Sequence, residues 1–182
     1  MPLSLRCRSV PPCDHADPVS SLAVVTAVDI VFRRYGDDDK LAVETFRCTT
    51  PGERWTKPPQ RVIRCAPQEI RDGADARLVV AEEQAGRIVG VVVFGPNEHR
   101  WYIHAIGVVR DRRRQGIGER LKITALAEIA AVAGGRQNVF SEVHKNNLAM
   151  LGLNDKLNVL RAPDPENRAH FISAIAVTPA GP

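Results

Sequence analysis

A long stretch without proline most constrains how this chain can fold. No proline lies between Asn97 and Ala162, whereas seven of the 13 prolines lie in the first 60 residues. Because proline removes a backbone donor and interrupts helices and central strands, regular structure should be densest in the proline-free stretch. Within it, the apolar segment 101–109 predicts a strand, and the pattern that begins at Gly116 predicts an amphipathic helix ending at Gly134-Gly135.

The predicted helix has one apolar and one polar face. The apolar stripe comprises Ile117, Leu121, Ala125, Ile129 and Val132, and the polar face comprises Glu119, Arg120, Lys122 and Glu128.

The rest of the chain alternates between strands and helices, which predicts an α/β protein. β-branched and aromatic residues predict strands over 24–35, 138–144 and 170–177, and a hairpin of 78–83 and 87–95 turns at Gly86. Helices are expected over 66–73 and 147–157, with a turn at 36–40 and an irregular loop over 49–60. The 182 residues suit a single domain over 21–182, preceded by a flexible leader over 1–20.

Composition excludes several classes of protein. The longest apolar run, 22–32, is about half the length of a membrane-spanning helix and contains Asp29, so no membrane association is expected. The four cysteines form no CxxC pair, and a zinc site from Cys7, Cys13 and His15 fits no common ligand spacing, so no metal is expected. Free thiols and the lack of a signal-peptide pattern predict a cytoplasmic protein.

The turn between the predicted strand 101–109 and the predicted helix is the segment whose residues indicate a binding site. The segment 108–118 reads VVRDRRRQGIG, so three consecutive arginines and two glycines precede the helix. The unpaired N–H groups and dipole of a helix N-terminus attract anions, and glycine lets phosphates approach the backbone. A Walker loop is absent, and Leu121 stands where a GxGxxG fingerprint needs glycine. The pattern therefore indicates a pyrophosphate site, with a solvated basic turn as the alternative.

These residues resemble the acetyl-CoA-binding signature of the GCN5-related N-acetyltransferase (GNAT) superfamily, [QR]-x-x-G-x-[GA], here Arg113-x-x-Gly116-x-Gly118. Downstream, Val143, Asn147 and the segment 153–159 (LNDKLNV) are similar to that family's "V…N…LYEKLGF" segment. The resemblance covers about 78–160. It implies a central mixed, mostly antiparallel sheet flanked by helices and splayed at the CoA-binding strand.

The resemblance also implies where acetyl-CoA, as co-substrate, would bind. The pyrophosphate would rest on the motif turn, formed by Arg113, Arg114, Gln115, Gly116, Ile117 and Gly118. The pantetheine arm would pair with the main chain of Val108, Val109 and Arg110, where a backbone N–H would polarise the thioester carbonyl. Asn147 matches a pantetheine-contacting asparagine of the family. A plain helix N-cap is an equal alternative for Asn147, and Asn146 could serve in either role.

The resemblance implies several candidate catalytic residues rather than a single set. Candidate bases for the attacking amine are His104, Glu142 and His144, with ordinary polar residues at a strand rim or water-mediated deprotonation as alternatives. Many family members use a tyrosine to protonate the leaving thiolate, but Asn154 stands at that position here. Asparagine is no acid, although it could hold a water, and a thiol of pKa about 8.5 leaves fairly readily without full protonation.

The sequence therefore predicts a CoA-dependent N-acyltransferase that transfers acetyl to a primary amine on a small molecule, peptide or protein. Two alternatives remain. One is acetylation of aminoacyl-tRNA, the only nucleic acid considered as a partner, and the other is a non-catalytic acyl-CoA-binding regulatory module, which Asn154 favours. A homodimer is one option for the oligomeric state.

Overall fold

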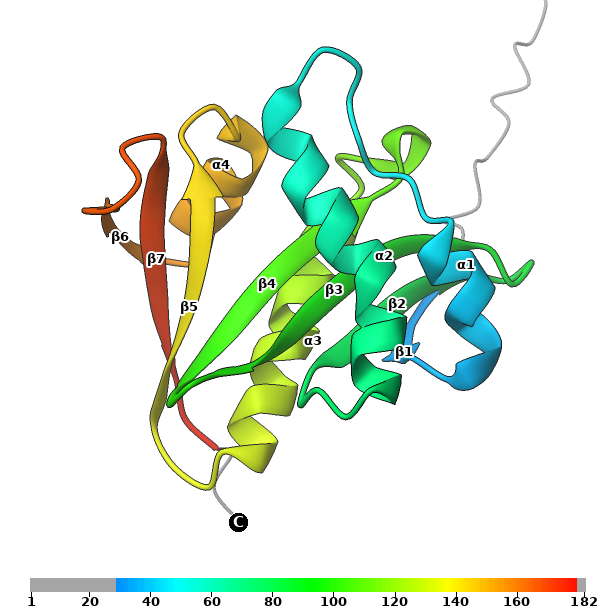
Figure 1. The fold of residues 1–182 in the computed structure, drawn as a ribbon, viewed down its shortest axis with the longest axis horizontal. Helices are drawn as coiled ribbons and strands as arrows, with labels where there is room; N and C mark the ends of the chain where they lie inside the picture. The colour runs from blue at the N-terminus through cyan, green and yellow to red at the C-terminus, as the bar shows by residue number, and fades with distance from the viewer. Residues whose placement is uncertain (1–28, 180–182) are drawn as a thin grey trace, which may run out of the picture.

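The computed structural model describes residues 29–179, which form one seven-stranded sheet with helices on both faces (Figure 1). The strands are β1 (Ile30–Arg34), β2 (Arg77–Glu83), β3 (Ile88–Asn97), β4 (Arg100–Val108), β5 (Gln137–His144), β6 (Leu160–Pro163) and β7 (His170–Val177). The helices are α1 (Lys40–Glu44), α2 (Lys57–Arg71), α3 (Ile117–Val132) and α4 (Leu148–Lys156), with 3₁₀ turns at Asp37–Asp39, Arg54–Thr56 and Arg110–Arg112.

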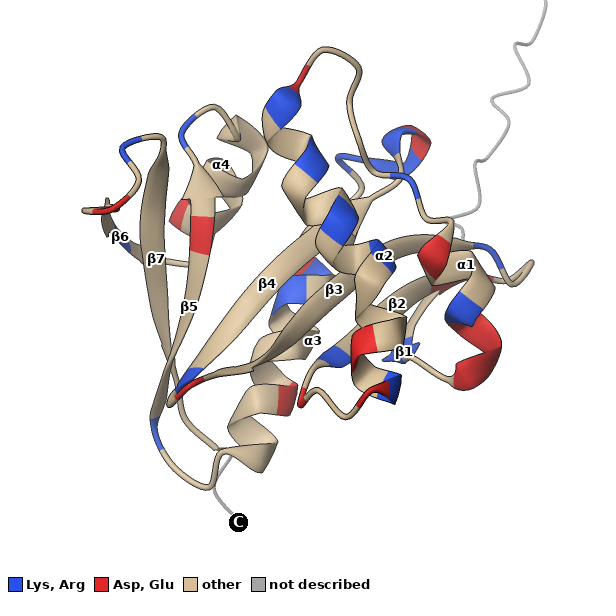
Figure 2. Ribbon diagram, in the orientation of Figure 1, with Lys and Arg blue, Asp and Glu red and all other residues tan. Residues whose placement is uncertain are grey.

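The sheet has the order β1-β2-β3-β4-β5-β7-β6, and β4–β5 is the one parallel pair among the described strands. This mixed, mostly antiparallel sheet flanked by helices confirms the predicted architecture. Figure 2 shows that charged residues lie mainly on the helices and loops, while β3 and β7 carry none. In β3 eight of the ten residues are buried, as expected for an apolar strand whose two faces are both covered.

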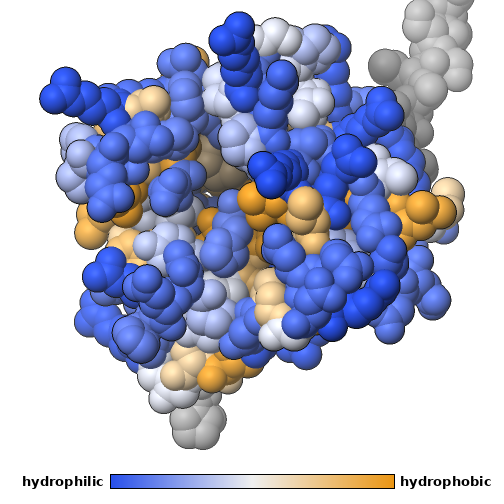
Figure 3. Space-filling model, in the orientation of Figure 1, coloured by the Kyte–Doolittle hydropathy of each residue, from blue (hydrophilic) through white to orange (hydrophobic). Residues whose placement is uncertain are grey.

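The sheet opens between β4 and β5. These strands pair only at Trp101–Val139 and Tyr102–Phe140 and then diverge (Figure 1). Within β4, Ile103 faces Phe94 and Ala105 faces Val93, so His104 is the extra residue of a β-bulge. The space-filling view shows a hollow in this region, between α2 and α4 (Figure 3). The predicted splay at the motif strand is therefore present.

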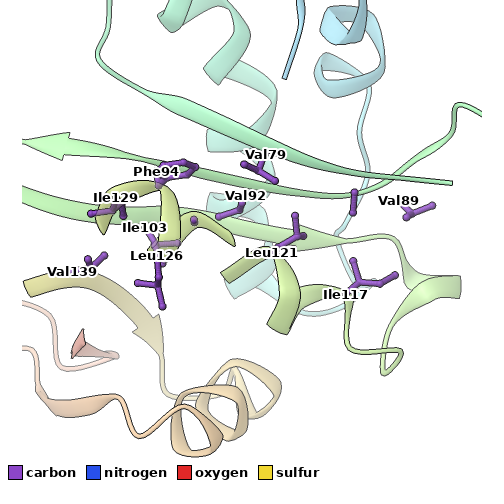
Figure 4. Packing of buried hydrophobic residues seen from close by; sticks show 12 residues of the cluster. Val79, Val89, Val92, Phe94, Ile103, Ile117, Leu121, Leu126, Ile129 and Val139 are labelled. Atoms are coloured by element: carbon purple, nitrogen blue, oxygen red, sulfur yellow. The ribbon is translucent and has the colours of Figure 1, made fainter. Parts of the chain in front are cut away.

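Alternation along β3 divides the core into two clusters. Val92 and Phe94 face α3, where they pack with Leu121, Leu126 and Ile129 (Figure 4). Val91 and Val93 face the opposite side, where they pack with Val43 of α1 and Ile63 of α2. A close approach at Gly107 seats α2 against β4, because a Cβ there would lie 2.7 Å from Ile63 Cδ1. The two clusters hold both helical layers rigidly against the central strands.

Several element predictions differ from the structure. The first strand covers 30–34 rather than 24–35, with 24–28 outside the described residues, and α1 follows the predicted turn at 36–40. The predicted loop 49–60 contains a 3₁₀ turn and the start of α2, because Pro58 and Pro59 occupy the first helical turn, where their missing N–H groups would be unpaired anyway. The short, exposed edge strand β6 was not predicted.

The faces of α3 also differ from the prediction at two positions. Val132 is 42% exposed, whereas Lys122, expected on the polar face, is 2% exposed. The stripe that is buried runs through Leu121, Ala125 and Ile129 but also through the adjacent row of Lys122 and Leu126.

The predicted leader 1–20 and the cysteines considered for zinc, Cys7 and Cys13, lie outside the described residues. Within residues 29–179, no group of three or more His, Cys, Asp or Glu side chains could hold a metal ion. Nor does any helix in that range have the length and apolar character needed to cross a membrane.

Candidate active site

The turn from β4 into α3 leaves backbone N–H groups without helical partners. Gly116 takes a left-handed conformation with φ of +78°, which glycine adopts without strain, and caps the helix N-terminus. The first helical bond runs from the Arg120 N–H to the Gly116 carbonyl at 3.0 Å. The N–H groups of Ile117 and Gly118 therefore precede the helical hydrogen bonds and lie at the positive end of the helix dipole.

The three consecutive arginines have different roles. Arg112 pairs with Glu83. Arg113 donates to the Cys48 carbonyl at 2.6 Å and to the Thr50 hydroxyl at 2.7 Å, so its guanidinium ties the 48–50 segment to the turn. Arg114 is exposed and has no side-chain partner among residues 29–179. Of the three, Arg114 is thus the cation left for a ligand.

A cleft of about 560 Å³ opens beside this turn. Its walls come from the motif turn, from the 3₁₀ turn and first turn of α2, and from α4. The lining includes the predicted Val108, Arg113, Arg114, Gly116, Ile117, Gly118 and Asn147. It also includes Cys48, Trp55, Thr56, Pro59, Met150 and Leu153, which were not predicted because their elements could not be placed from sequence.

Three predicted cofactor residues, Val109, Arg110 and Gln115, do not line this cleft. The Val109 N–H donates to the Val89 carbonyl of β3 at 3.0 Å. Because successive N–H groups of a strand alternate in direction, this bond turns the Val108 N–H toward the open edge that faces β5. The edge next to the cleft therefore has a main-chain donor at Val108 that pairs with no strand within residues 29–179.

Asn147 begins α4 and also lines the cleft. Its Oδ1 accepts a hydrogen bond from the Met150 N–H at 3.1 Å, so Asn147 is the helix N-cap, and Asn146 is not. The Asn147 amide nitrogen has no hydrogen-bond partner in the described part of the chain. The cap and a ligand contact are therefore compatible in one side chain.

The candidate bases separate in space. His104 and Glu142 both line a cavity of about 420 Å³ between α2 and the start of β4, and both line a smaller cavity of about 50 Å³ in the β4–β5 gap. His144 lines neither, because its ring stacks on Trp55 and its Nδ1 accepts from the Asn146 N–H. Burial lowers the pKa of His104, opposed by a hydrogen bond to the backbone of Gly95, so a neutral ring is available at pH 7.

Asn154 does not face the cleft, contrary to its expected place beside the leaving thiolate. It is completely buried, accepts a hydrogen bond from the Lys122 ammonium, and donates to the Ser173 hydroxyl at 3.1 Å. Lys122 itself lines the 50 Å³ cavity, and burial lowers its pKa to about 8. Lys122 lies four residues before Leu126 and seven before Ile129. This helical spacing is the sequence signal that would have placed Lys122 on the buried face.

Known proteins share both the sequence pattern and the fold. The sequence model of the acetyltransferase (GNAT) family matches residues 40–158. No curated protein matches the chain.

Solved structures of acetyltransferases superpose on most of the chain. The ribosomal-protein-S18-alanine N-acetyltransferase from Escherichia coli is 18% identical, with a TM-score of 0.58 over 84% of this chain and 97% of that one. The PaiA N-acetyltransferase from Thermoplasma acidophilum, in complex with coenzyme A, is 11% identical, with a TM-score of 0.63 over 80% and 98%. YhbS from E. coli, also in complex with CoA, is 16% identical, with a TM-score of 0.59 over 83% of each chain.

At these identities the structures share the fold alone, while the family match covers well over half of the sequence and includes the motif turn, α3 and α4. The chain therefore belongs to the acetyltransferase (GNAT) family, whose enzymes transfer acyl groups from CoA.

Proposed function

We propose that this enzyme transfers the acetyl group of acetyl-CoA to a primary amine by direct attack of the amine on the thioester. The main observation in support of this proposal is a row of three cavities that crosses the β4–β5 gap. The central cavity shares Ile106, Asn147 and Met150 with the cleft at the motif turn. It shares Ile103, His104 and Glu142 with the cavity beyond. Donor and acceptor can thus enter from opposite ends and meet in the gap.

The motif turn supplies the donor end. The N–H groups at the start of α3 and the Arg114 guanidinium offer hydrogen bonds and positive charge to the pyrophosphate of CoA. The pantetheine arm would run along the open edge of β4, where the Val108 N–H is available to polarise the thioester carbonyl.

His104 is the favoured base at the acceptor end. The β-bulge places it at the junction of two cavities, and its lowered pKa keeps the ring able to accept a proton at neutral pH. The amine nitrogen attacks the carbonyl carbon, and His104 takes the proton that the nitrogen then carries. Glu142, on the facing strand, lines the same two cavities and is the second candidate.

One surface feature bears on the acceptor. Arg54 of the 3₁₀ turn and Lys57 and Arg61 of the adjoining α2 are exposed, and none has an ion-pair partner within residues 29–179 (Figure 2). This helix separates the cleft at the motif turn, here called the donor cleft, from the 420 Å³ cavity beyond the gap, here called the acceptor cavity. The acceptor cavity itself is lined by Glu69, Asp75 and Glu142. The row of cations outside it therefore favours acceptors that carry negative charge away from the amine, and aminoacyl-tRNA is retained as a second candidate substrate.

The test is release of CoA thiol from acetyl-CoA across a panel of amines, with product mass confirming one added acetyl group. The panel comprises free amino acids, peptides with a free N-terminus or an internal lysine, in neutral and acidic versions, and aminoacyl-tRNA. We expect release above the amine-free rate with at least one acceptor. CoA binding without turnover on any of them would instead support a binding module.

A further inference from the structure

Lys122 is a buried cation without a counter-ion. It is 2% exposed, and its ammonium has one hydrogen-bond partner among the described residues, the Asn154 side-chain oxygen. No carboxylate of residues 29–179 lies within 4.0 Å of it. Burial of an unpaired charge is costly, and an apolar side chain of similar length would fill the same space in α3 without that cost. A fold alone does not require lysine here.

The side chain lies where donor and acceptor must meet. Lys122 reaches from α3 into the 50 Å³ cavity in the β4–β5 gap. Other walls of this cavity are Asn147 and Met150, shared with the donor cleft, and His104 and Glu142, shared with the acceptor cavity. Since the thioester would have to lie between the two ends, a side chain that lines this cavity is close to the bond that would break.

We propose that Lys122 is the proton donor to the leaving thiolate of CoA, an inference that rests on the proposed acetyl transfer. The amine forms the new C–N bond, and the C–S bond breaks with its electron pair on sulfur. An ammonium proton of Lys122 then passes to that sulfur, which leaves CoA as the thiol and Lys122 as a neutral amine. The proton of the acceptor nitrogen goes to His104, which releases it to water, and Lys122 regains a proton from water, so both residues return to their starting states.

The acidity of Lys122 suits this transfer. Its pKa of about 8 lies close to that of a thiol, about 8.5, so the proton moves between groups of matched strength. An ordinary lysine, with a pKa near 10.4, would hold its proton against the sulfur. Two titratable groups face the same cavity, His104 from β4 and Glu142 from β5, while α2 and α4 contribute only Pro59, Asn147 and Met150.

Asn154 is then a positioning residue. It holds the ammonium by its oxygen and is itself anchored by its amide to Ser173 of β7, at 3.1 Å. An asparagine orients the lysine without adding a negative charge that would raise the lysine pKa. The asparagine in place of the family's tyrosine is thus explained by a proton donor from another helix.

The first experiment needs no acceptor. The ionised fraction of bound CoA is measured by thiolate absorbance at pH 7.5, in the wild type, in Lys122→Met and in the matched control Lys40→Met on α1. Free CoA should be at most about one-tenth ionised at this pH. We expect the ionised fraction to be at least about threefold larger in the wild type and the control than in Lys122→Met, because a cation beside the sulfur lowers the pKa of the thiol. Equal ionisation in all three, with CoA bound, would overturn the inference and leave the proposed function standing. Failure to bind CoA at all would overturn the proposed function.

The second experiment uses the best amine of the panel. Wild-type kcat should fall above about pH 8, as Lys122 loses its proton. Lys122→Met should lower kcat about a hundredfold, remove that fall, and leave the KM for acetyl-CoA within about twofold. Asn154→Asp keeps the lysine and places a carboxylate beside it, so the fall should move at least one pH unit upward. If kcat still falls above about pH 8 in both variants, Lys122 has only a structural role.

Discussion

The ammonium of Lys122 makes the stability of the protein depend on alkaline pH. Its pKa is about 8 in the folded chain and 10.5 for an unburied lysine. Below pH 8 both states are protonated, and the cost of burying the charge is constant. Between pH 8 and 10.5 the unfolded state binds more protons than the native state, so the free energy of unfolding rises with pH.

Lys122→Met lacks this titration. We therefore expect the stability of the wild type relative to the variant to increase by about 3 kcal/mol between pH 7 and pH 10.5, measured by urea unfolding at both pH values. Other groups titrate alike in both proteins and cancel in the difference. Parallel stability curves across this range would contradict a lysine buried in its charged form.

Cys48 is a second residue whose environment alters its chemistry. It lines the donor cleft, and burial raises the pKa of its thiol to about 11. At pH 8 its thiolate fraction should be on the order of a hundredfold below that of a thiol with the usual pKa of about 8.5. Alkylation followed by peptide mass spectrometry should label the exposed Cys65 well before Cys48, and CoA should protect Cys48 further. Equal labelling of the two cysteines would contradict a buried Cys48 thiol.

At the scale of elements, a substitution at the N-terminus of α3 should change ligand binding without changing folding. A Cβ at Gly118 would meet only Val108 Cγ2, at 3.7 Å, and its backbone is not left-handed. Gly118→Asp should therefore fold normally but lose at least a hundredfold in CoA affinity, because a side chain and a negative charge would occupy the phosphate site. Gly135→Asp, at an open position past the other end of α3, is the control and should bind CoA like the wild type. Calorimetric titration measures both, and retained affinity in Gly118→Asp would refute the phosphate-binding turn.

The exposed cations at the start of α2 and in the 3₁₀ turn before it lead to a prediction about the acceptor. The combined change of Arg54, Lys57 and Arg61 to Gln removes three charges and no described hydrogen bond or ion pair. We expect the KM for an acidic acceptor peptide to rise about tenfold, with kcat and the KM for acetyl-CoA unchanged. The neutral version of the same peptide is the control. An equal effect on both peptides would mean that the row of cations does not select by charge.

Sequence patterns were informative for some elements and misleading for others. Strand 101–109, the motif turn and α3 were predictable because apolar periodicity, glycines and the absence of proline all agree there. Helix α2 was not, because Pro58 and Pro59 suggest a loop unless their place in a first helical turn is known. Edge strand β6 is exposed throughout and ends in proline, so it lacks the alternation that marks a half-buried strand.

At the scale of the whole molecule, the reaction centre depends on contacts that no local pattern encodes. His104 and Glu142 share a cavity only because a bulge in β4 and the limited β4–β5 pairing open the sheet beside them. Lys122 enters the same gap from the opposite face of the sheet. The residue types of His104 and Glu142 suggested chemistry, but their meeting point with Lys122 follows from the topology, in which β5 and β7 lie across the gap from β4.

This topology predicts that CoA acts as a bridge between the two parts of the sheet. The cleft takes its walls from α2 and the motif turn on one side of the gap and from α4 on the other. Because CoA binds only the folded protein, CoA at a hundred times its Kd should stabilise the fold by about 2.7 kcal/mol. Hydrogen exchange with CoA should therefore slow in residues 110–119, 48–59 and 147–153 together by more than the increase in global stability explains, while β1 and β2 should slow by no more than that increase. Slowing confined to 110–119 would show instead that the ligand rests on the turn alone and that the two sides of the gap open independently.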